Sequence, residues 1–257
     1  MGIVNITPDS FSDGSIDRIS NNYIEECCSN AEKLINEGAD IIDFGGESTN
    51  PKSTFVPADE EIRRVVPVVE RFRSKYPTFP ISIDSRKYEV CKELIKYNIQ
   101  YINDISGLTY NPKMVELAVD SDINLIIMHY REHHDTHYAN VVNDVYDFLY
   151  KQIKYAESFN VKNIIIDLGI GFGKECSDNL TLLKNIQNFD SLGYPMLLGI
   201  SRKRFIGEVI QEPNPTERDF ATMIYHALLL KENNIKIIRV HNVKLAKQLK
   251  NIYNSIC

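Results

Sequence analysis

Short apolar segments recur along the whole chain and alternate with longer amphipathic segments. Each apolar segment has four to six residues and is rich in Ile and Val, which is typical of strands buried on both faces. The predicted strands lie at residues 2–6, 40–44, 80–84, 101–105, 123–128, 163–167, 195–200 and 235–240. The clearest helical patterns span residues 22–38, 59–76, 141–159 and 217–233. Gly38 is predicted to end the first helix, and Pro67 to kink the second.

Eight strands that alternate with about eight helices leave two architectures open. One is a doubly wound parallel sheet, and the other is a (β/α)8 barrel, or TIM barrel. A barrel needs roughly 250 residues, and the chain has 257 with no linker or low-complexity tract. We therefore predict an α/β protein in which residues 1–257 form a single TIM-barrel domain.

Composition and charge exclude several classes of protein. The net charge of −6 argues against a nucleic-acid or anionic-membrane partner. The five cysteines are odd in number and include no CxxC pair, so a disulfide framework is not expected and a reducing compartment is. No apolar run approaches the roughly 20 residues of a membrane span, and no secretory leader is visible. We therefore expect a cytoplasmic protein.

Nearly every predicted strand ends in a polar residue. Because the chemistry of a (β/α)8 barrel lies at the C-terminal ends of its strands, these residues are predicted to share one rim. A single Asp after a strand is more often a helix cap or turn residue than a ligand, but a ring of buried polar groups needs a polar partner. The rim residues are Asn5, Asp84, Asn103, Asp104, His129, Asp167, Ser201, Arg202, Lys203, Arg239 and His241.

The residue types on this rim indicate a ligand with two parts. Asp84, Asn103 and Asp167 offer acceptors and one amide donor, which suits a flat heterocycle with amino and ring N–H groups. The basic residues that end the last two strands suit anionic oxygens, and an arginine can also stack on a ring. We therefore predict a heterocycle site beside an anion site.

The glycine-rich segment IIIDLGIGFGK, residues 164–174, fails both common phosphate motifs. A P-loop needs Gly where Leu168 stands and Ser or Thr where Glu175 stands, and the dinucleotide fingerprint needs Gly where Lys174 stands. We predict instead that the glycines form a tight loop that passes a ligand and places Phe172 over it. Lys174 has no assigned role.

Three further loops are candidates for a functional role. REHHDTHY at residues 131–138 has the residue types of a metal site, but no predicted element fixes their spacing, so a solvated loop is the preferred interpretation. The segments at 7–14 and 45–53 are long for connections between a strand and a helix. Either could be an ordinary surface loop, although Phe11 at a polar tip indicates a lid.

Eight successive segments resemble the motifs of dihydropteroate synthases, a family of folate-pathway enzymes. The match runs in order from residue 1 to about residue 250. Related pterin-binding methyltransferases share the barrel and its Asp–Asn–Asp ring but generally lack the first two loops and the SRK segment. The segments are NITPDSFSDG, GADIIDFGGESTNP, ISIDSRK, YINDISG, IIMH, IIIDLGIGFGK, LLGISRKRFIG and IIRVHNVK.

The resemblance implies a reaction and a set of site residues. Dihydropterin pyrophosphate and p-aminobenzoate would give dihydropteroate and pyrophosphate with Mg2+, in a homodimer. Pterin binding is implied for Asp84, Asn103, Met128, Asp167, Lys203 and Arg239. Pyrophosphate binding is implied for Asn5, Arg239 and His241, with Asn5 also near the metal. The p-aminobenzoate side is implied to comprise Thr49, Pro51, Phe172, Ser201 and Lys203, with Phe11 and Ser48 in the closing loops and Asp84, Lys203 and Arg239 in catalysis.

The chemistry agrees with these roles. Loss of pyrophosphate leaves a carbocation on the pterin methylene, which carboxylates beside the ring would stabilise while cations hold the leaving anion. Ordered loops would hold p-aminobenzoate in line and exclude water. The aniline nitrogen attacks a cation, so neither a protein nucleophile nor a general base is expected.

The chain departs from the family pattern in several places. Asn50 stands where Arg is usual, Arg86 stands where Lys is usual, and Leu168 and Ile170 replace Pro and Phe. The N-terminal hairpin that plugs the barrel in relatives is missing, so we expect an open barrel bottom or a chain that is a piece of a longer product. These departures keep two alternatives open. One is an inactive paralogue that retains the pterin pocket, and the other is the pterin domain of a methyltetrahydrofolate-dependent methyltransferase.

Overall fold

Eight parallel strands form one sheet in which every strand lies beside its neighbours in the sequence. The computed structural model describes residues 1–7, 20–48, 54–131, 137–231 and 234–256. This sequential order excludes the doubly wound alternative, in which the strand order would reverse. The strands are β1 (Gly2–Asn5), β2 (Ile42–Gly45), β3 (Ile81–Asp84), β4 (Tyr101–Asp104), β5 (Asn124–Met128), β6 (Ile164–Asp167), β7 (Met196–Leu198) and β8 (Ile235–Ile238).

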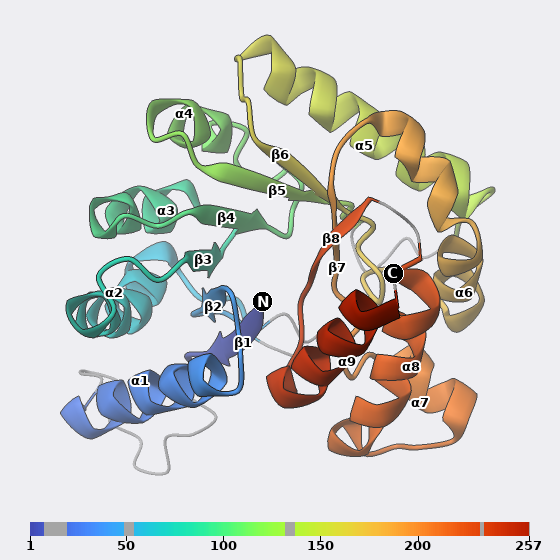
Figure 1. Ribbon diagram of the computed structural model, residues 1–257. Helices are drawn as coiled ribbons and strands as arrows, with labels where there is room; N and C mark the ends of the chain where they lie inside the picture. Colours follow the sequence, from blue (N-terminus) through green and yellow to red (C-terminus); the bar gives the residue numbers. More distant parts are fainter. Residues whose placement is uncertain (8–19, 49–53, 132–136, 232–233, 257) are drawn as a thin grey trace.

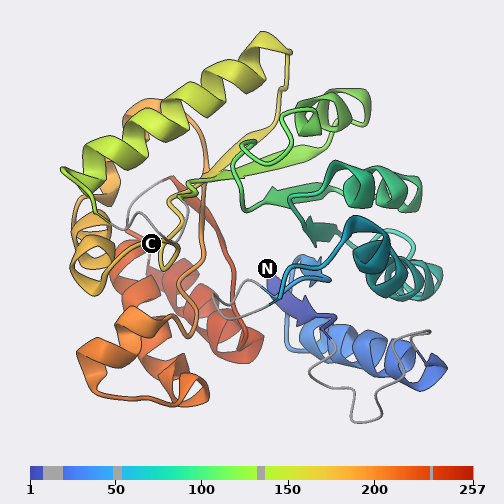
Figure 2. The same cartoon turned by 180° about the vertical axis from the view of Figure 1, so that it is seen from behind.

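The sheet closes on itself where the chain leaves β8 and meets β1. Gly2 and Val240 form a parallel bridge. The amide of Val240 donates to the carbonyl of Met1 at 3.0 Å, and the amide of Ile3 donates to the carbonyl of Val240 at 3.3 Å. The strands lie at the centre of the molecule and the helices lie outside them (Figures 1 and 2). The predicted TIM barrel is confirmed.

The helices begin and end close to the predicted positions. Ser20 accepts a hydrogen bond from Tyr23 at the start of α1, and Gly38 follows its end with φ of 102°, a conformation that glycine adopts readily. The second helix continues through Pro67 without interruption. The helices are α1 (Asn21–Asn36), α2 (Ala58–Lys75), α3 (Tyr88–Leu94), α4 (Met114–Asp120), α5 (Val141–Ser158), α6 (Cys176–Lys184), α7 (Arg204–Ile210), α8 (Asp219–Leu229) and α9 (Val243–Ile256).

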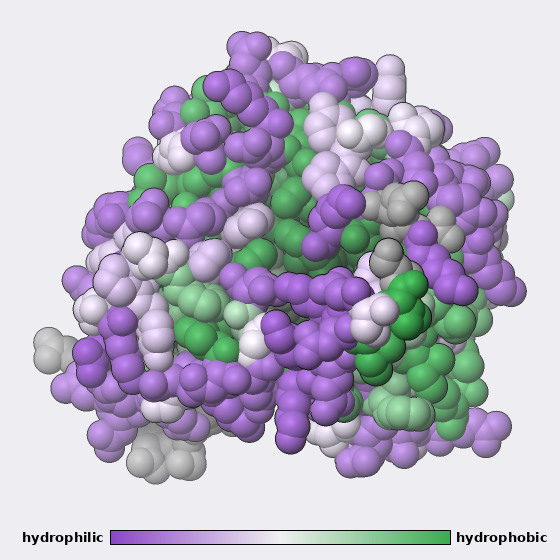
Figure 3. All heavy atoms as spheres, viewed as in Figure 1, coloured by the Kyte–Doolittle hydropathy of each residue, from purple (hydrophilic) through white to green (hydrophobic). Residues whose placement is uncertain are grey.

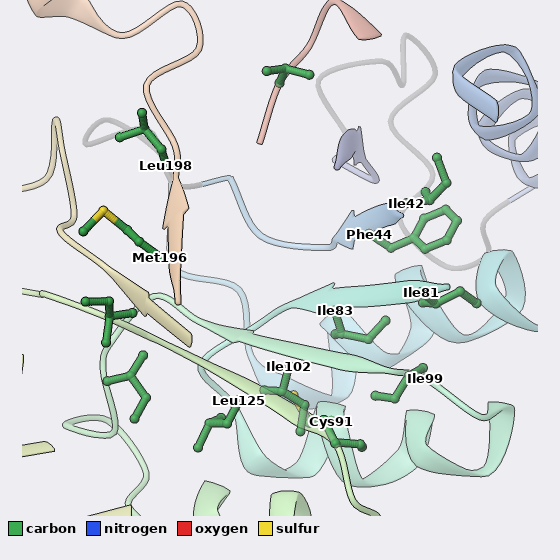
Figure 4. Packing of buried hydrophobic residues seen from close by; sticks show 14 of the residues in the cluster. Ile42, Phe44, Ile81, Ile83, Cys91, Ile99, Ile102, Leu125, Met196 and Leu198 are labelled. Carbon is green, nitrogen blue, oxygen red and sulfur yellow. The ribbon is translucent and has the colours of Figure 1, made fainter. Parts of the chain in front are cut away.

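Side chains alternate between the two faces of the sheet, which produces two separate apolar regions. The larger lies between the strands and the helices and includes Ile83, Ile102 and Leu125, which are register partners on three neighbouring strands (Figure 4). The smaller lies inside the barrel and comprises the buried residues Met1, Ile41, Ile126, Ile165 and Leu197. Among the residues that the structure describes, no helix is long and apolar enough to cross a membrane.

Candidate active site

A cavity of about 850 Å³ opens at the C-terminal ends of the strands. Its volume falls within the range typical of small-molecule sites. Most of the predicted site residues line it, namely Asn5, Ser48, Asp84, Phe172, Ser201, Lys203, Arg239 and His241. Three further predicted residues, Phe11, Thr49 and Pro51, lie outside the described part of the chain.

The remaining predicted residues are buried next to the cavity rather than on its lining. Parallel register places Asn103 beside Asp84 and Met128 beside Asp167, so each pair shares the inward face of two neighbouring strands. Oδ1 of Asp84 and Oδ1 of Asn103 are buried and have no hydrogen-bond partner within the described residues. Since buried acceptors are rarely left unpaired, these two atoms indicate a ligand that donates hydrogen bonds.

Arg239 lies between two carboxylates inside the barrel. Its Nε donates to Oδ2 of Asp43 and its Nη2 donates to Oδ2 of Asp84, each at 2.6 Å. Burial lowers the pKa of Arg239, but the two carboxylates outweigh that effect and raise it above its usual value. Asp43 is fully buried and reaches Arg239 from an inward position of β2. It therefore anchors the arginine independently of Asp84.

The pKa of Asp84 is raised to about 7, mainly because the carboxyl is buried. The positive charge of Arg239 opposes this rise, whereas the negative charge of Asp43 adds to it. Burial likewise raises the pKa of Asp167, although its Oδ1 accepts a hydrogen bond from the amide of Gly169 at 2.8 Å. Burial and the nearby Arg239 lower the pKa of Lys203 to about 8. The site therefore holds carboxyl and amine groups that titrate near neutral pH.

Ser201 and His241 form a second polar unit on the cavity wall. Oγ of Ser201 lies 2.9 Å from Nδ1 of His241 and accepts a hydrogen bond from the His241 amide at 3.2 Å. Burial, helped by the charges of Arg202 and Arg239, lowers the pKa of His241 to about 4. In the tautomer whose Nδ1 accepts the hydroxyl proton, the neutral imidazole carries its own proton on Nε2, where it can donate to an anion.

The glycine-rich segment forms the tight loop that the sequence predicts. Gly169, Gly171 and Gly173 all have positive φ values, and a Cβ atom at Gly169 would lie 2.0 Å from the carbonyl oxygen of His129. The loop brings the ring of Phe172 over the amine of Lys203, which lies 3.9 Å from the ring centroid. The tight loop is therefore confirmed, while the placement of Phe172 over a ligand stays a prediction.

Leu168 and Ile170 lie outside the cavity. Both side chains are buried in the larger apolar cluster between the strands and the helices. Neither is among the residues that line the cavity. These two departures from the family pattern therefore change the packing behind the site rather than the surface that meets a ligand.

Sequence reasoning missed several buried charges close to the site. Asp43 interrupts an apolar strand, and that signal could have identified it. Lys87 is 1% exposed and bonds to Glu61 on α2 and to Glu47 on the cavity wall, the latter at 2.7 Å. Its partners are 26 and 40 residues away in the sequence, so no local pattern indicates this cluster.

Metal-ligand clusters are absent from the described ranges. No group of three or more His, Cys, Asp or Glu side chains there could hold an ion. Most of the histidine-rich segment, residues 132–136, lies outside those ranges, so the metal interpretation of that segment stays untested. Within the cavity, Asn5 supplies an amide oxygen at the end of β1.

Comparison with known proteins places the chain in one family. A family model described as pterin binding enzyme matches residues 1–241. The dihydropteroate synthase of Bacillus subtilis (strain 168) is 42% identical over 246 residues, which cover 95% of this chain and 83% of the relative. The solved dihydropteroate synthase of Xanthomonas albilineans with 4-aminobenzoic acid has a TM-score of 0.91 and 36% identity, covering 100% of this chain and 92% of that chain. The enzyme from Thermus thermophilus in complex with 6HMPPP has a TM-score of 0.86 and 33% identity, covering 100% of this chain and 93% of that chain. The chain therefore belongs to the dihydropteroate synthase family of pterin-binding enzymes.

Proposed function

We propose that this transferase joins 6-hydroxymethyl-7,8-dihydropterin pyrophosphate to p-aminobenzoate and releases pyrophosphate and 7,8-dihydropteroate. One observation carries the proposal. Two unpaired buried acceptors, on Asp84 and Asn103, lie beside the cationic Arg239 at the mouth of the barrel. These acceptors suit a ligand with N–H donors, and the basic residues on the same wall suit a negative charge, as in a pterin diphosphate.

The pterin ring is proposed to lie against Asp84, Asn103 and Asp167. The first two offer acceptor atoms with no hydrogen-bond partner in the described residues. Oδ1 of Asp167 accepts from the Gly169 amide, which leaves Oδ2 of Asp167 for the ring. In this pose the ring N–H groups take the place of the guanidinium at Asp84. Arg239 then keeps its hydrogen bond to Asp43, and its Nη2, released from Asp84, faces the ring or the diphosphate.

The diphosphate is proposed to bind Asn5, Arg239 and His241. All three line the cavity, and the neutral His241 can donate from Nε2. A magnesium ion fits this donor set, because Mg2+ usually takes few protein ligands and completes its shell with phosphate oxygens and water. Asn5 would be its protein ligand. When bound, the ion would neutralise charge that develops on the departing pyrophosphate.

The p-aminobenzoate is proposed to bind between Phe172, Lys203 and Ser201. The relative from Xanthomonas albilineans contains 4-aminobenzoic acid, which supports a site of this kind. The ring of Phe172 offers an apolar face, while Ser201 offers a hydroxyl. Thr49 and Pro51, with Ser48 and Phe11 in the closing loops, are proposed to complete this side.

The reaction needs no protein nucleophile. The bond between the pterin methylene and the diphosphate oxygen breaks, and the oxygen takes the electron pair. The lone pair of the aniline nitrogen then forms the new C–N bond, and one N–H proton passes to solvent or to pyrophosphate. Asp84 and Asp167 stabilise the positive charge that spreads over the ring, while Arg239 stabilises the leaving anion.

Product formation tests the proposal directly. Purified protein with Mg2+ and both substrates is expected to form dihydropteroate, as measured by chromatography against a sample without enzyme. An inactive paralogue would bind the pterin in calorimetry but would not bind p-aminobenzoate after pyrophosphate is added. A methyltransferase domain would instead bind methyltetrahydrofolate and require a cobalamin partner. Either result in a folded preparation contradicts the synthase proposal.

A homodimer through the outer helices is also proposed. Phe220, Ile224 and Leu228 recur every four residues on α8 and are 72%, 47% and 64% exposed. Hydrophobic residues gather over this side of the molecule in Figure 3. An exposed apolar stripe of this kind suits a second copy of the chain. Light scattering should give a dimer for the wild type and a monomer for Phe220→Asp, and a wild-type monomer at micromolar concentration would contradict it.

We propose further that residues 1–257 form a single domain, because one sheet takes in both the first and the last strand. A cytoplasmic location is proposed because the described cysteines form no disulfide bonds. Cys27, Cys28, Cys91 and Cys176 all have free thiols. Such thiols are typical of proteins in a reducing compartment.

A further inference from the structure

Lys174 is a buried cavity residue that has no part in the proposed chemistry. Its side chain turns back under the loop that joins β6 to α6. Nζ lies 2.9 Å from the carbonyl oxygen of Gly169, 3.2 Å from that of Phe172 and 2.8 Å from Nδ1 of His129. In its protonated form the amine has three N–H donors, and these three acceptors use all of them. Burial lowers the pKa of Lys174 to about 7, so both the protonated and the neutral amine are populated near neutral pH.

The partner atom on His129 is an acceptor. Burial, helped by the nearby charge of Lys174, lowers the pKa of His129 to about 2, so the imidazole is neutral at physiological pH. Opposite the protonated amine of Lys174, Nδ1 carries the lone pair and the ring proton lies on Nε2. The ring also packs edge to face against Phe148 at 4.9 Å, which holds it in place behind the loop.

Two further hydrogen bonds lie within the loop, from the Gly169 amide to Oδ1 of Asp167 and from the Phe172 amide to the carbonyl of Gly169. Its glycines all adopt positive φ, and glycine loses more conformational freedom on folding than any other residue. From the side of α6, Oδ1 of Asn179 accepts a hydrogen bond from the Gly171 amide at 2.7 Å. Lys174 thus holds the carbonyl groups on one side of the turn while Asn179 holds an amide on the other.

We propose that Lys174 is a positioning residue for the p-aminobenzoate side of the cavity. Its amine fixes the turn at residues 168–174 through these contacts and, through this turn, holds the ring of Phe172 over Lys203. This inference rests on the proposed function for its substrate, but the geometry of the turn does not depend on that function. Two independent readouts therefore test it.

The first readout is amide hydrogen exchange in the peptide that contains Gly171 and Phe172. Lys174→Met shortens the unbranched side chain by only one atom and removes all its donors, so we expect exchange to become at least about tenfold faster. Lys184→Met makes the same change at an exposed position of α6 and should leave the peptide unaffected. Unchanged exchange in Lys174→Met overturns the proposal, whatever the protein catalyses.

The second readout separates the two substrates. In Lys174→Met the KM for p-aminobenzoate should rise about tenfold, while the dissociation constant of the pterin substrate alone changes less than about threefold. An equal loss for both substrates, or no loss, overturns the positioning role. If exchange is faster in Lys174→Met but the wild type forms no product, the proposed function is rejected and the role of Lys174 in the turn stands.

Lys174→Gln keeps the experiment decisive if Lys174→Met does not fold. Glutamine retains two N–H donors, so its effects on both readouts should lie between those of the wild type and those of Lys174→Met. If Gln replaces Lys with no change in either readout, the three-donor arrangement is not required and the proposal fails.

Discussion

The inside of the barrel has two layers of opposite chemistry, which lie only two residues apart on the same strands. The floor is the interior apolar cluster described above, and the rim is the set of polar residues at the C-terminal ends of the strands. On β6, Ile165 belongs to the interior apolar cluster, and Asp167 is the next inward residue. Just before and within β2, Ile41 is followed in the same way by Asp43. Strand alternation fixes which residues face inward, whereas the change from apolar to charged sets where packing ends and ligand binding begins.

The comparison teaches that the two layers have different tasks. Floor residues fill space and stabilise the barrel. Rim residues carry charges and unpaired acceptors that are costly to bury, so they are retained for their ligand rather than for stability. Substitutions on the floor should therefore change stability at constant affinity, and substitutions on the rim should change affinity at nearly constant stability.

The largest expected effect is a loss of stability on the floor. Ile126→Ala removes a fully buried side chain from the barrel interior and should lower the free energy of unfolding by about 2–5 kcal/mol. Chemical denaturation measures this loss, and calorimetry with the pterin substrate should give an unchanged affinity. Ile256→Ala, at an exposed position, is the matched control. A stable Ile126→Ala variant with weakened pterin binding would contradict the division between floor and rim.

The next effect is a loss of affinity on the rim. Asp84→Asn keeps the shape of the side chain but replaces one acceptor with a donor that faces the ligand's own donors. An unsatisfied buried group costs about 1–3 kcal/mol, so pterin affinity should fall roughly 5- to 150-fold in calorimetry. Asp59→Asn on the exposed start of α2 should have no effect. Unfolding of Asp84→Asn at moderate temperature would show instead that the carboxylate is structural.

The pH dependence of stability sharpens the comparison further. Burial raises the pKa of Asp84 to about 7, whereas an Asp in the unfolded chain has a pKa of about 3.9. Between these values the folded state binds more protons than the unfolded state, so stability falls as pH rises from about 4 to 7. The slope for one proton is at most about 1.4 kcal/mol per pH unit.

Comparison of the wild type with Asp84→Asn isolates this contribution, because other buried carboxyl groups, including Asp104, also titrate abnormally. The difference in unfolding free energy between the two proteins should change across the window in the stated direction. Parallel curves from pH 4 to 7 would mean that Asp84 titrates normally in the folded protein.

The sequence predicts the barrel and most of the rim for the same physical reason. Apolar runs of strand length are local, and parallel strands bring their polar ends together wherever they lie in the chain, so Asp84 and Asp167 could be placed without a structure. The ion pairs could not be predicted in this way. Asp43 meets Arg239 across 196 residues, and Lys87 meets Glu47 across 40, and only the folded chain defines such distances. Pro67 lies within α2, which continues through it, and the kink that its local rule predicts stays a prediction.

The smallest expected effects concern two residues on the β6–α6 loop that lie two positions apart. Phe172→Leu removes the ring that covers Lys203, an interaction worth about 0.5–2 kcal/mol, so the KM for p-aminobenzoate should rise roughly 2- to 30-fold. Ile170→Leu conserves volume in the packed layer behind the site and should leave both KM values and kcat unchanged while costing less than about 1.5 kcal/mol of stability. Steady-state kinetics and thermal unfolding of the two variants measure both effects. Ile170→Leu could instead impair catalysis as much as Phe172→Leu. In that case the departures at Leu168 and Ile170 act on the ligand site itself, and this loop does not separate packing residues from binding residues.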